Sequence, residues 1–412
     1  MSADRAGNRR VCSPWIGPLI GWLTLALGAG SSGAEVVLIE NRTSEDLAFR
    51  LSGAEGRSLD GRSVSGRLLP VAVTGRIAVA FRAGNKLRRF ALEPNRAYAF
   101  VPSAEGARLA AIPLEPDPRK RRAAVSDGKL LGGLRPRTVT VKLLVDDDEP
   151  SVRRLWEPKL RRRIAAASAV FQRHCNVTLK VVEVATWNSD DQAVDFAESL
   201  REFERGVDPG KAMVAVGFTS QYPLPTGKTH LGGTRGPLHP WVLVREWSQH
   251  VTASERLEVL VHELGHYLGA AHSPERTSVM RPTMGDRLSH AKNFVIRFDA
   301  LNALAMCLVA RQRDDYRDRR RLGLRMDPAA ASAMRRIYAT LDKRMPMDPA
   351  AGQLLAMFGG PKPEKPFRWD LLVDPPDAPP GRPPARSERP GFYERGGMRV
   401  GRPEGRLPAG VG

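Results

Sequence analysis

The sequence predicts a layered α/β domain that follows a small all-β domain and precedes a helical extension. Apolar strands alternate with amphipathic helices from Thr138 onward, short alternating apolar runs fill residues 35–114, and two Asp-Pro-Ala-Ala runs follow residue 313. Alternating strands and helices are typical of helices packed on a twisted sheet, whereas closely spaced strands between turns are typical of all-β modules. The expected segments are an N-terminal signal (1–34), a small all-β domain (35–114), a basic linker (115–137), the α/β domain (138–312), a helical extension (313–359) and a disordered tail (360–412).

The first 34 residues have the three parts of an export signal. Arg5, Arg9 and Arg10 form a basic start, Trp15 to Ala29 is an apolar stretch, and Ser32-Gly33-Ala34 gives a small-residue cleavage site. This pattern is typical of secretory signal peptides. The apolar stretch is shorter than the roughly 20 residues that a membrane-spanning helix needs, which argues against an uncleaved anchor. We therefore expect a secreted, periplasmic or cell-surface protein.

Residues 35–114 are expected to form the small all-β domain. Its function as a binding domain, a pro-domain or a packing scaffold stays open. Asn41-Arg42-Thr43 also fits the acceptor pattern for N-glycosylation. The apolar runs, separated by glycine, asparagine and proline turns, are Val36–Ile39, Leu47–Leu51, Ile77–Phe81 and Tyr98–Val101.

The segment from Glu115 to Arg137 is rich in proline, glycine and charge and is expected to be an exposed linker. Its basic run, Arg119 to Arg122, is either simply solvated or a place where a trypsin-like protease separates the β domain from the rest, because exposed loops are where nicking concentrates.

The α/β domain is predicted to begin with a strand over Thr138–Val145. The helix that follows has apolar residues at helical spacing, namely Leu155, Leu160, Ile164, Ala167 and Phe171. The remaining elements before residue 250 are expected from their length and apolar pattern. In chain order they are the helix Ser151–Cys175, the strand Val177–Val184, the helix Asp190–Glu204 and the strands Ala212–Phe218 and Trp241–Val244.

The chain after residue 311 changes composition. Arg311 to Arg325 contains seven arginines, and Asp327-Pro328 and Asp348-Pro349 each place an N-cap aspartate before a proline at the first helical position. Two more helices are therefore expected. From Gly360 onward, 12 prolines and 9 glycines in 53 residues leave few apolar anchors, which predicts a disordered tail.

The formal net charge of +19 suggests a polyanionic partner only if the charge lies at the site. Residues 138–310 contain 21 lysines and arginines against 20 aspartates and glutamates, so the surplus lies in the flanks. We expect no nucleic-acid partner and a monomer, with attachment to an anionic cell surface or solubility as uses of the basic flanks. Three cysteines exclude a disulfide framework, and Cys175 and Cys307 form either one disulfide or two buried thiols.

A metal-binding helix is predicted near residue 253. Thr252-Ala253-Ser254-Glu255 is a capping box, which satisfies free backbone N–H groups at a helix start. His262 and His266 lie four residues apart and project from one side of this helix, where two imidazoles can hold one metal ion. Gly269 allows the chain to leave the helix in a backbone conformation that other residues resist, so that His272 can return as a third ligand.

The stretch His262-Glu263-Leu264-Gly265-His266-Tyr267-Leu268-Gly269-Ala270-Ala271-His272 resembles the extended zinc signature of the metzincin metallopeptidases at every fixed position. Beyond it, Ser278-Val279-Met280-Arg281-Pro282 resembles the methionine-containing turn that lies beneath the zinc in this clan. Pro282 after Met280, together with Ser273 after the third histidine, is most similar to the matrixin branch. An unassigned bacterial-type metzincin branch is the alternative.

The resemblance implies a zincin-like α+β catalytic domain with a twisted mixed sheet, an active-site helix and a methionine turn. It also implies one catalytic Zn²⁺ held by His262, His266 and His272, with Glu263 as general base and Met280 in the structural turn. The implied activity is zinc-dependent hydrolysis of protein or peptide substrates by an endopeptidase. Two alternatives stay open, namely an extracellular surface-binding protein with a vestigial zinc site and a zinc hydrolase acting on a non-protein substrate.

Three further features are weaker. Thr229–Thr234 lies where this clan has an edge strand that pairs with extended substrate, and His230 and His239 are candidates for further metal ligands. The acidic runs Asp146–Glu149 and Asp190-Asp191 are either calcium ligands or acids that favour the start of a helix. The loop through which vertebrate matrixins bind a structural zinc and calcium has no evident counterpart between Gly217 and Glu246.

Overall fold

The protein was analysed as a computed structural model that describes residues 35–119, 125–193, 196–220, 231–234, 239–246, 251–282, 288–311 and 326–361. The expected export signal, most of the basic run from Arg119 to Arg122, the arginines after Arg311 and the tail beyond residue 361 lie outside the described residues. Within the described part, no helix is both long and apolar enough to cross a membrane.

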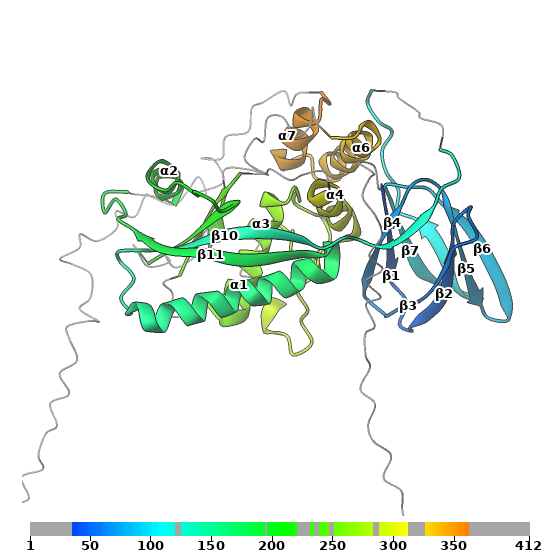
Figure 1. Cartoon of the computed structure of the whole chain (residues 1–412), viewed down its shortest axis with the longest axis horizontal. Helices are drawn as coiled ribbons and strands as arrows, with labels where there is room; N and C mark the ends of the chain where they lie inside the picture. Colours follow the sequence, from blue (N-terminus) through cyan, green and yellow to red (C-terminus); the bar gives the residue numbers. More distant parts are fainter. Residues whose placement is uncertain are drawn as a thin grey trace, which may run out of the picture. The chain divides into compact units, whose positions relative to one another are not determined.

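The N-terminal β region is built from two sheets that share a core (Figure 1). One sheet has the order β8-β7-β1-β4-β9 and the other β3-β2-β5-β6. Phe81 and Phe100 meet edge-to-face with their ring centroids 4.9 Å apart, which joins the two sheets by an aromatic contact. The strands are β1 Glu35–Asn41, β2 Leu47–Ser52, β3 Ser58–Ser63, β4 Leu68–Val73, β5 Ile77–Ala83, β6 Lys86–Leu92, β7 Arg96–Ser103, β8 Gly106–Ala111 and β9 Leu130–Gly133.

Strand β9 lies inside the segment predicted to be an exposed linker. It pairs antiparallel with β4, and Leu130 and Leu134 are buried. The prediction of exposure is therefore wrong for these residues, because two leucines in a short Gly-rich stretch complete a sheet rather than meeting water. The chain thus returns to the β region before it enters the α/β domain.

Asn41 is not an accessible glycosylation acceptor. Its side-chain N–H groups donate to the carbonyl oxygens of Glu45 and Ser63, each at 2.8 Å, and the residue is fully buried. Both donors of the amide are used to hold a turn beside β1, so a glycan could be attached only to an unfolded chain. The turn that the Asn41 side chain holds therefore explains this asparagine without glycosylation.

The central sheet of the α/β domain has the strand order β11-β10-β12-β14-β13. All neighbouring strands are parallel except β13, which runs antiparallel to β14, so the sheet is mixed as predicted. The inner strands β12 and β14 are nearly continuous apolar runs because both of their faces are covered. The strands are β10 Arg137–Asp146, β11 Val177–Trp187, β12 Val214–Thr219, β13 Gly232–Gly233 and β14 Trp241–Arg245.

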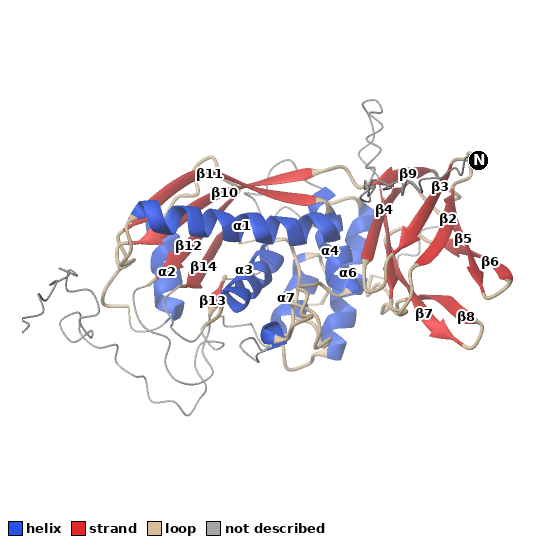
Figure 2. Cartoon of the chain, turned by 90° about the horizontal axis from the view of Figure 1, so that it is seen from below, coloured by secondary structure: helices blue, strands red, loops and turns tan. Residues whose placement is uncertain are grey.

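Helices cover both faces of this sheet (Figure 2). Leu144, Ala215 and Leu243 share a core with α2 Phe196–Gly206, whereas the alternate residues of the same strands share the main core with the other helices. This division follows from the two-residue period of a strand. The helices on the main core are α1 Arg153–Cys175, α3 Ala253–Tyr267 and α4 Ala300–Arg311, and a short 3-10 turn, η1, covers Leu288–His290.

Two helices differ from their predictions in detail. Leu155 was placed on the buried stripe of α1, but it is 62% exposed and Trp156 is buried in its place, since residue 156 is one helical turn before Leu160. Helix α2 begins at Phe196 rather than at Asp190. Cys175 and Cys307 are both buried free thiols, which resolves the alternative left open above.

The two predicted helices of the extension are present as α6 Pro328–Arg344 and α7 Pro349–Met357. Asp327 caps α6 by accepting from the backbone N–H of Ala329 and Ala330, and Asp348 caps α7 by accepting from Ala350. Figures 1 and 2 show α4, α6 and α7 as neighbours, and Ile337, Tyr338 and Leu354 are buried in the main core. The extension is therefore packed onto the α/β domain.

Candidate metal centre

Helix α3 carries the first two histidines and begins at the predicted capping box. The Thr252 hydroxyl accepts from the backbone N–H of Glu255 at 3.2 Å, and the Glu255 carboxylate accepts from the backbone N–H of Thr252 at 2.8 Å. His262 and His266 are buried one turn apart on this helix. The cap thus fixes where the helix starts, and the helix fixes the spacing of the two imidazoles.

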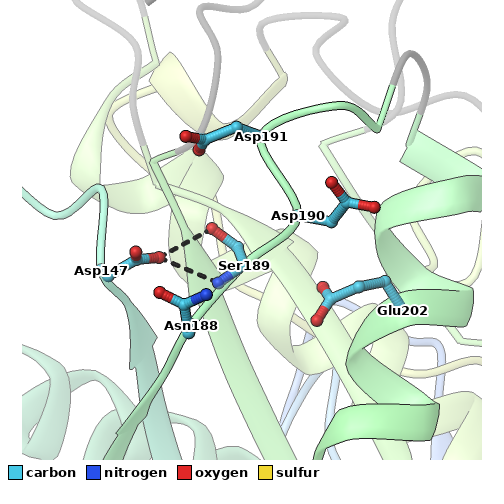
Figure 3. Close-up of a pocket in the computed structure, with 6 residues that line it drawn as sticks. All are labelled: Asp147, Asn188, Ser189, Asp190, Asp191 and Glu202. Atoms are coloured by element: carbon cyan, nitrogen blue, oxygen red, sulfur yellow. Dashed lines mark hydrogen bonds between the residues drawn. The ribbon is translucent and has the colours of Figure 1, made fainter.

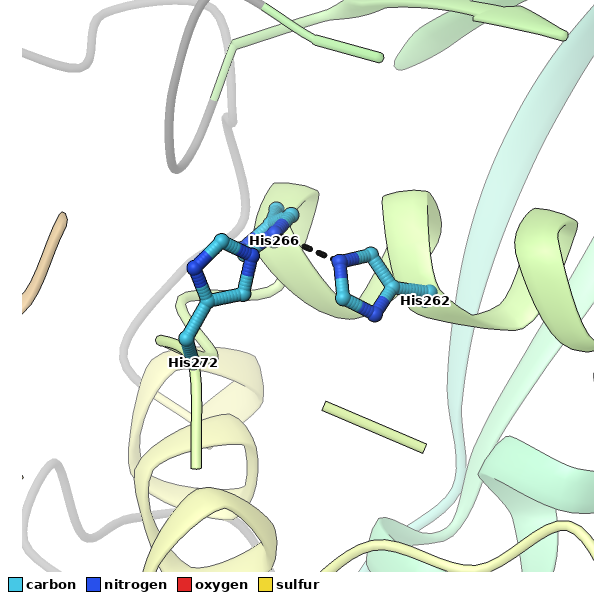
Figure 4. A group of neighbouring side chains, drawn as sticks. All are labelled: His262, His266 and His272. Carbon is cyan, nitrogen blue, oxygen red and sulfur yellow. Dashed lines mark hydrogen bonds between the residues drawn. The ribbon is translucent and has the colours of Figure 1, made fainter. Parts of the chain in front are cut away.

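The third histidine returns through a glycine turn. Gly269 adopts a φ of +92°, a left-handed conformation that most residues avoid, and its backbone N–H donates to the carbonyl oxygen of His266 at 2.9 Å. The chain then reverses and places His272 beside the other two histidines (Figure 4). The glycine predicted to end the helix therefore performs that role.

The three imidazoles form the one group of metal-ligating side chains found among the described residues. One nitrogen from each of His262, His266 and His272 lies within 4.8 Å of the others. The Nε2 atoms of His262 and His266 are 3.0 Å apart. This spacing and donor set fit a tetrahedral metal with three nitrogen ligands, of which zinc is the usual example.

Hydrogen bonds determine which nitrogens face the metal. The Nδ1 atom of His262 bonds the carbonyl oxygen of Val279 at 2.7 Å, and the Nδ1 atom of His266 bonds that of Ala270 at 2.9 Å. A carbonyl oxygen only accepts, so Nδ1 carries the proton and Nε2 presents its lone pair. The structure therefore selects the tautomer that binds a metal.

Burial keeps these imidazoles neutral. Burial, together with the neighbouring histidines, lowers the pKa of His266 to about 3 and the pKa of His262 well below its ordinary value. A neutral imidazole is the form that ligates metals.

Glu263 is buried directly beside the ligands. Burial raises the pKa of its carboxyl to about 8 in the absence of a nearby cation. A dication held by the three histidines would counteract this shift and favour the carboxylate. The Cγ atom of Glu263 lies 3.2 Å from the position that a Cβ on Gly232 would occupy, so the edge strand β13 runs against the candidate base.

Met280 packs against helix α3. It is fully buried, and its Sδ atom lies 2.8 Å from the position that a Cβ on Gly265 would occupy. Its carbonyl oxygen accepts from the backbone N–H of Ser273 at 2.8 Å, which ties the methionine turn to the residue after the third histidine. The turn therefore contacts both α3, which carries His262 and His266, and the residue that follows His272.

Two polar residues that the sequence analysis did not select hold this arrangement together. Asp299 accepts from the Ser278 hydroxyl and from the Asn302 amide, each at 2.8 Å, and Asn302 accepts from the backbone N–H of Ala271 at 2.8 Å. All four residues are buried. An aspartate just before the apolar run of α4 was the available indication, since an N-cap is expected there.

The remaining candidates lie elsewhere. The Nδ1 atom of His239 is 3.3 Å from a Glu204 carboxylate oxygen, and His239 is not part of the histidine group. His230 lies outside the described residues. Gly232 and Gly233 do form an edge strand of the sheet, as expected.

The two acidic runs meet at one pocket (Figure 3). It is lined by Asp147, Asn188, Ser189, Asp190, Asp191 and Glu202. Asp147 accepts from both the backbone N–H and the hydroxyl of Ser189 at 2.9 Å. The acidic runs lie ahead of α1 and α2 and outside their first turns. Calcium binding by these acids stays a prediction.

Comparison with known proteins bears on the same segment. Residues 138–305 match the family model described as matrixin, whereas no curated protein matches the chain. Archaemetzincin from Methanopyrus kandleri is 19% identical over 42% of this chain and 97% of that chain, with a TM-score of 0.32. A chaperone–substrate complex is 14% identical over 67% of this chain and 41% of that chain, with a TM-score of 0.31.

The matched segment contains the three histidines, Glu263 and Met280. Residues 138–305 of this chain are therefore similar in sequence to the matrixin family.

Proposed function

We propose that the chain is an exported zinc endopeptidase in which Glu263 is the general base. The proposal rests mainly on one observation. The imidazoles of His262, His266 and His272 lie together, and the buried carboxyl of Glu263 is on α3, the helix that carries two of them. His262, His266 and His272 would hold the zinc ion. When bound, zinc supplies a Lewis acid that polarises a carbonyl and makes water more acidic.

Glu263 would carry out the proton transfers. Its carboxylate would take the proton of the attacking water and deliver one to the nitrogen of the leaving amine, which is the ordinary division of labour for a positioned carboxylate. Its buried position, with β13 on one side, keeps it in a fixed geometry, and fixed geometry is what such a base contributes.

Substrate would lie along β13. Among the described residues, Gly232 and Gly233 occupy the outer position of the sheet. An extended peptide can add to such an edge through main-chain hydrogen bonds, which are independent of its side chains. Because Gly232 lies against Glu263, a peptide paired there would pass close to the candidate base.

A digest of a peptide library by the purified chain, with and without a chelator, tests the activity, and products are identified by mass spectrometry. We expect chelator-sensitive cleavage. Glu263→Gln should lower kcat/KM by about 10²–10⁴-fold while zinc content stays unchanged. Glu105→Gln, at an exposed position of the β region, is the matched control and should be fully active. Zinc binding without cleavage of any peptide would refute the endopeptidase assignment.

Export is proposed from the first 34 residues alone. N-terminal sequencing of the protein recovered outside the cytoplasm should give Glu35 as the first residue. Recovery of the whole chain inside the cell, with its first residues intact, would contradict export.

A further inference from the structure

Asp348 contacts the third histidine of the metal centre. Its Oδ2 atom accepts a hydrogen bond from the Nδ1 atom of His272, 76 residues away in the sequence. Asp348 lies in the extension, beyond the matrixin segment that ends at residue 305. The contact thus joins the metal centre to a part of the chain that the family match does not include.

The three histidines differ in what holds them. His262 and His266 bond main-chain carbonyl oxygens of Val279 and Ala270, which are supplied by the matrixin segment itself. For His272 the Nδ1 partner is the side chain of Asp348. A carboxylate accepts only, so it leaves the proton on Nδ1 and directs the Nε2 lone pair away from itself. His272 is therefore oriented by a charged group, whereas the other two are oriented by neutral ones.

Asp348 is itself held in place. Its Oδ1 atom accepts from the backbone N–H of Ala350 at 3.0 Å and caps α7, so each carboxylate oxygen has a separate task. Leu354 of α7 and Phe358, which directly follows this helix, are buried, and the centroid of the Phe358 ring lies 5.6 Å from that of the Tyr338 ring of α6. The position of the carboxylate is thus set by the packing of the extension.

The extension also contacts the turn that leads to His272. The Tyr338 hydroxyl donates to the carbonyl oxygen of Gly269 at 2.6 Å, and Tyr338 is fully buried. Helix α6 therefore supports the chain three residues before the ligand, and Asp348 at the start of α7 supports the ligand itself. Two contacts from two helices converge on one short loop.

We propose that Asp348 is a positioning residue of the zinc site and that the extension, through it, is an integral part of that site. Carboxylates that bond the outer nitrogen of a metal-binding histidine fix its orientation and raise its basicity, and their loss typically weakens metal binding by about 10–100-fold. This inference rests on the proposed zinc site, but it concerns metal affinity and does not depend on which substrate is cleaved.

The test is the zinc affinity of the full chain, measured by competition with a chromophoric chelator. Asp348→Asn keeps the shape and the capping oxygen but removes the charge, and Asp348→Ser keeps a capping hydroxyl that is too short to reach His272. Both should bind zinc about 10–100-fold more weakly than the unchanged chain. Asp348→Glu, with its carboxylate retained, should recover part of the loss.

Asp327→Asn is the matched control. Asp327 precedes a proline and caps α6 in the same way, and its capping oxygen accepts from the backbone N–H of Ala329 at 2.9 Å. This variant should keep the zinc affinity of the unchanged chain. A melting temperature for each metal-free variant separates loss of the cap from loss of the histidine contact.

Unchanged affinity in both Asp348→Asn and Asp348→Ser would overturn the inference and leave the proposed function intact. Equal losses of affinity in Asp327→Asn and Asp348→Asn, in proportion to equal losses of melting temperature, would also overturn it, because the effect would then be one of stability. An unchanged chain that binds no zinc would instead refute the zinc site itself.

Discussion

Arg335 and Asp117 form a two-pronged ion pair that joins α6 to the chain just after the β region. The guanidinium Nε and Nη2 atoms donate to Oδ1 at 2.8 Å and to Oδ2 at 2.6 Å, and both side chains are about 5% exposed. The Ser332 hydroxyl donates to the same carboxylate at 2.6 Å. Asp117 is thus the point at which residues before the basic run are fixed to the extension.

Removing one partner of this pair should be costly. Asp117→Ala leaves a buried guanidinium without its counter-ion, and such a loss typically destabilises a protein by about 3–5 kcal/mol. Urea denaturation of the metal-free chain measures the free energy of unfolding. Asp60→Ala breaks the exposed pair with Arg50 and should lower the free energy of unfolding far less, because solvent screens exposed pairs. If Asp117→Ala and Asp60→Ala lowered the free energy of unfolding equally, burial of the Arg335–Asp117 pair would add nothing to its contribution to stability.

The same carboxylate predicts a pH dependence. Burial acts to raise the pKa of Asp117, but hydrogen bonds from Arg335 and Ser332 outweigh it and lower the pKa from 3.8 to about 2. A pKa that is lower in the folded state gives stability that is present above the unfolded pKa and is lost as the pH falls through the folded one. The stability difference between the unchanged chain and Asp117→Asn should therefore shrink between about pH 4 and pH 2. If the difference in the free energy of unfolding stayed constant over that range, the lowered pKa of Asp117 would be contradicted.

Gly232 should be needed for activity rather than for zinc binding. A Cβ at this position would lie 2.8 Å from Cγ1 of Val259 and 3.2 Å from Cγ of Glu263, so β13, Val259 or Glu263 must shift. Gly232→Ala should lower kcat/KM by at least about tenfold, since small misplacements of a catalytic group are costly. Gly206→Ala, whose Cβ would meet only a side-chain oxygen of Glu202 at 3.4 Å, is the control. If zinc affinity fell as much as kcat/KM, the change would have disturbed the ligands instead.

A cut in the basic run should not release the β region. Val36 and Leu38 share the main core with α4, Asp117 is paired with Arg335, and β9 pairs with β4 from the far side of the run. After limited trypsin digestion at Lys120–Arg122, the two fragments should elute together from a gel-filtration column and separate only in denaturant. Separate elution in native buffer would show that these contacts are too weak to hold the pieces.

The metal centre could be predicted from the sequence because its determinants are local. His262, His266 and His272 lie within 11 residues, and a capping box and a glycine define the helix between them. Helical spacing alone brings the first two together, and one left-handed residue returns the third. Met280 could be placed because it lies only eight residues beyond His272.

What the sequence could not reveal depends on contacts between distant segments. Asp348 was correctly predicted to cap a helix, but nothing in its surroundings indicates the partner of its second oxygen. The pairing of β9 with β4 also joins segments about 60 residues apart, across a run that looks like a linker. Leu155 and Trp156 are adjacent and both apolar, so the exact buried stripe depended on what packs against the helix.

Strand β1 gives alternate residues to two cores. Val37 and Ile39 belong to the interior of the β region, while Val36 and Leu38 belong to the main core around α4. Because one strand holds both interiors, neither can open without exposing apolar side chains of the other, so we expect the described part of the chain to melt as one cooperative unit in calorimetry. The same strand directly follows the expected signal cleavage site and pairs in parallel with β7, about 60 residues further on. Folding of the whole unit therefore has to wait until a strand made first finds partners made much later.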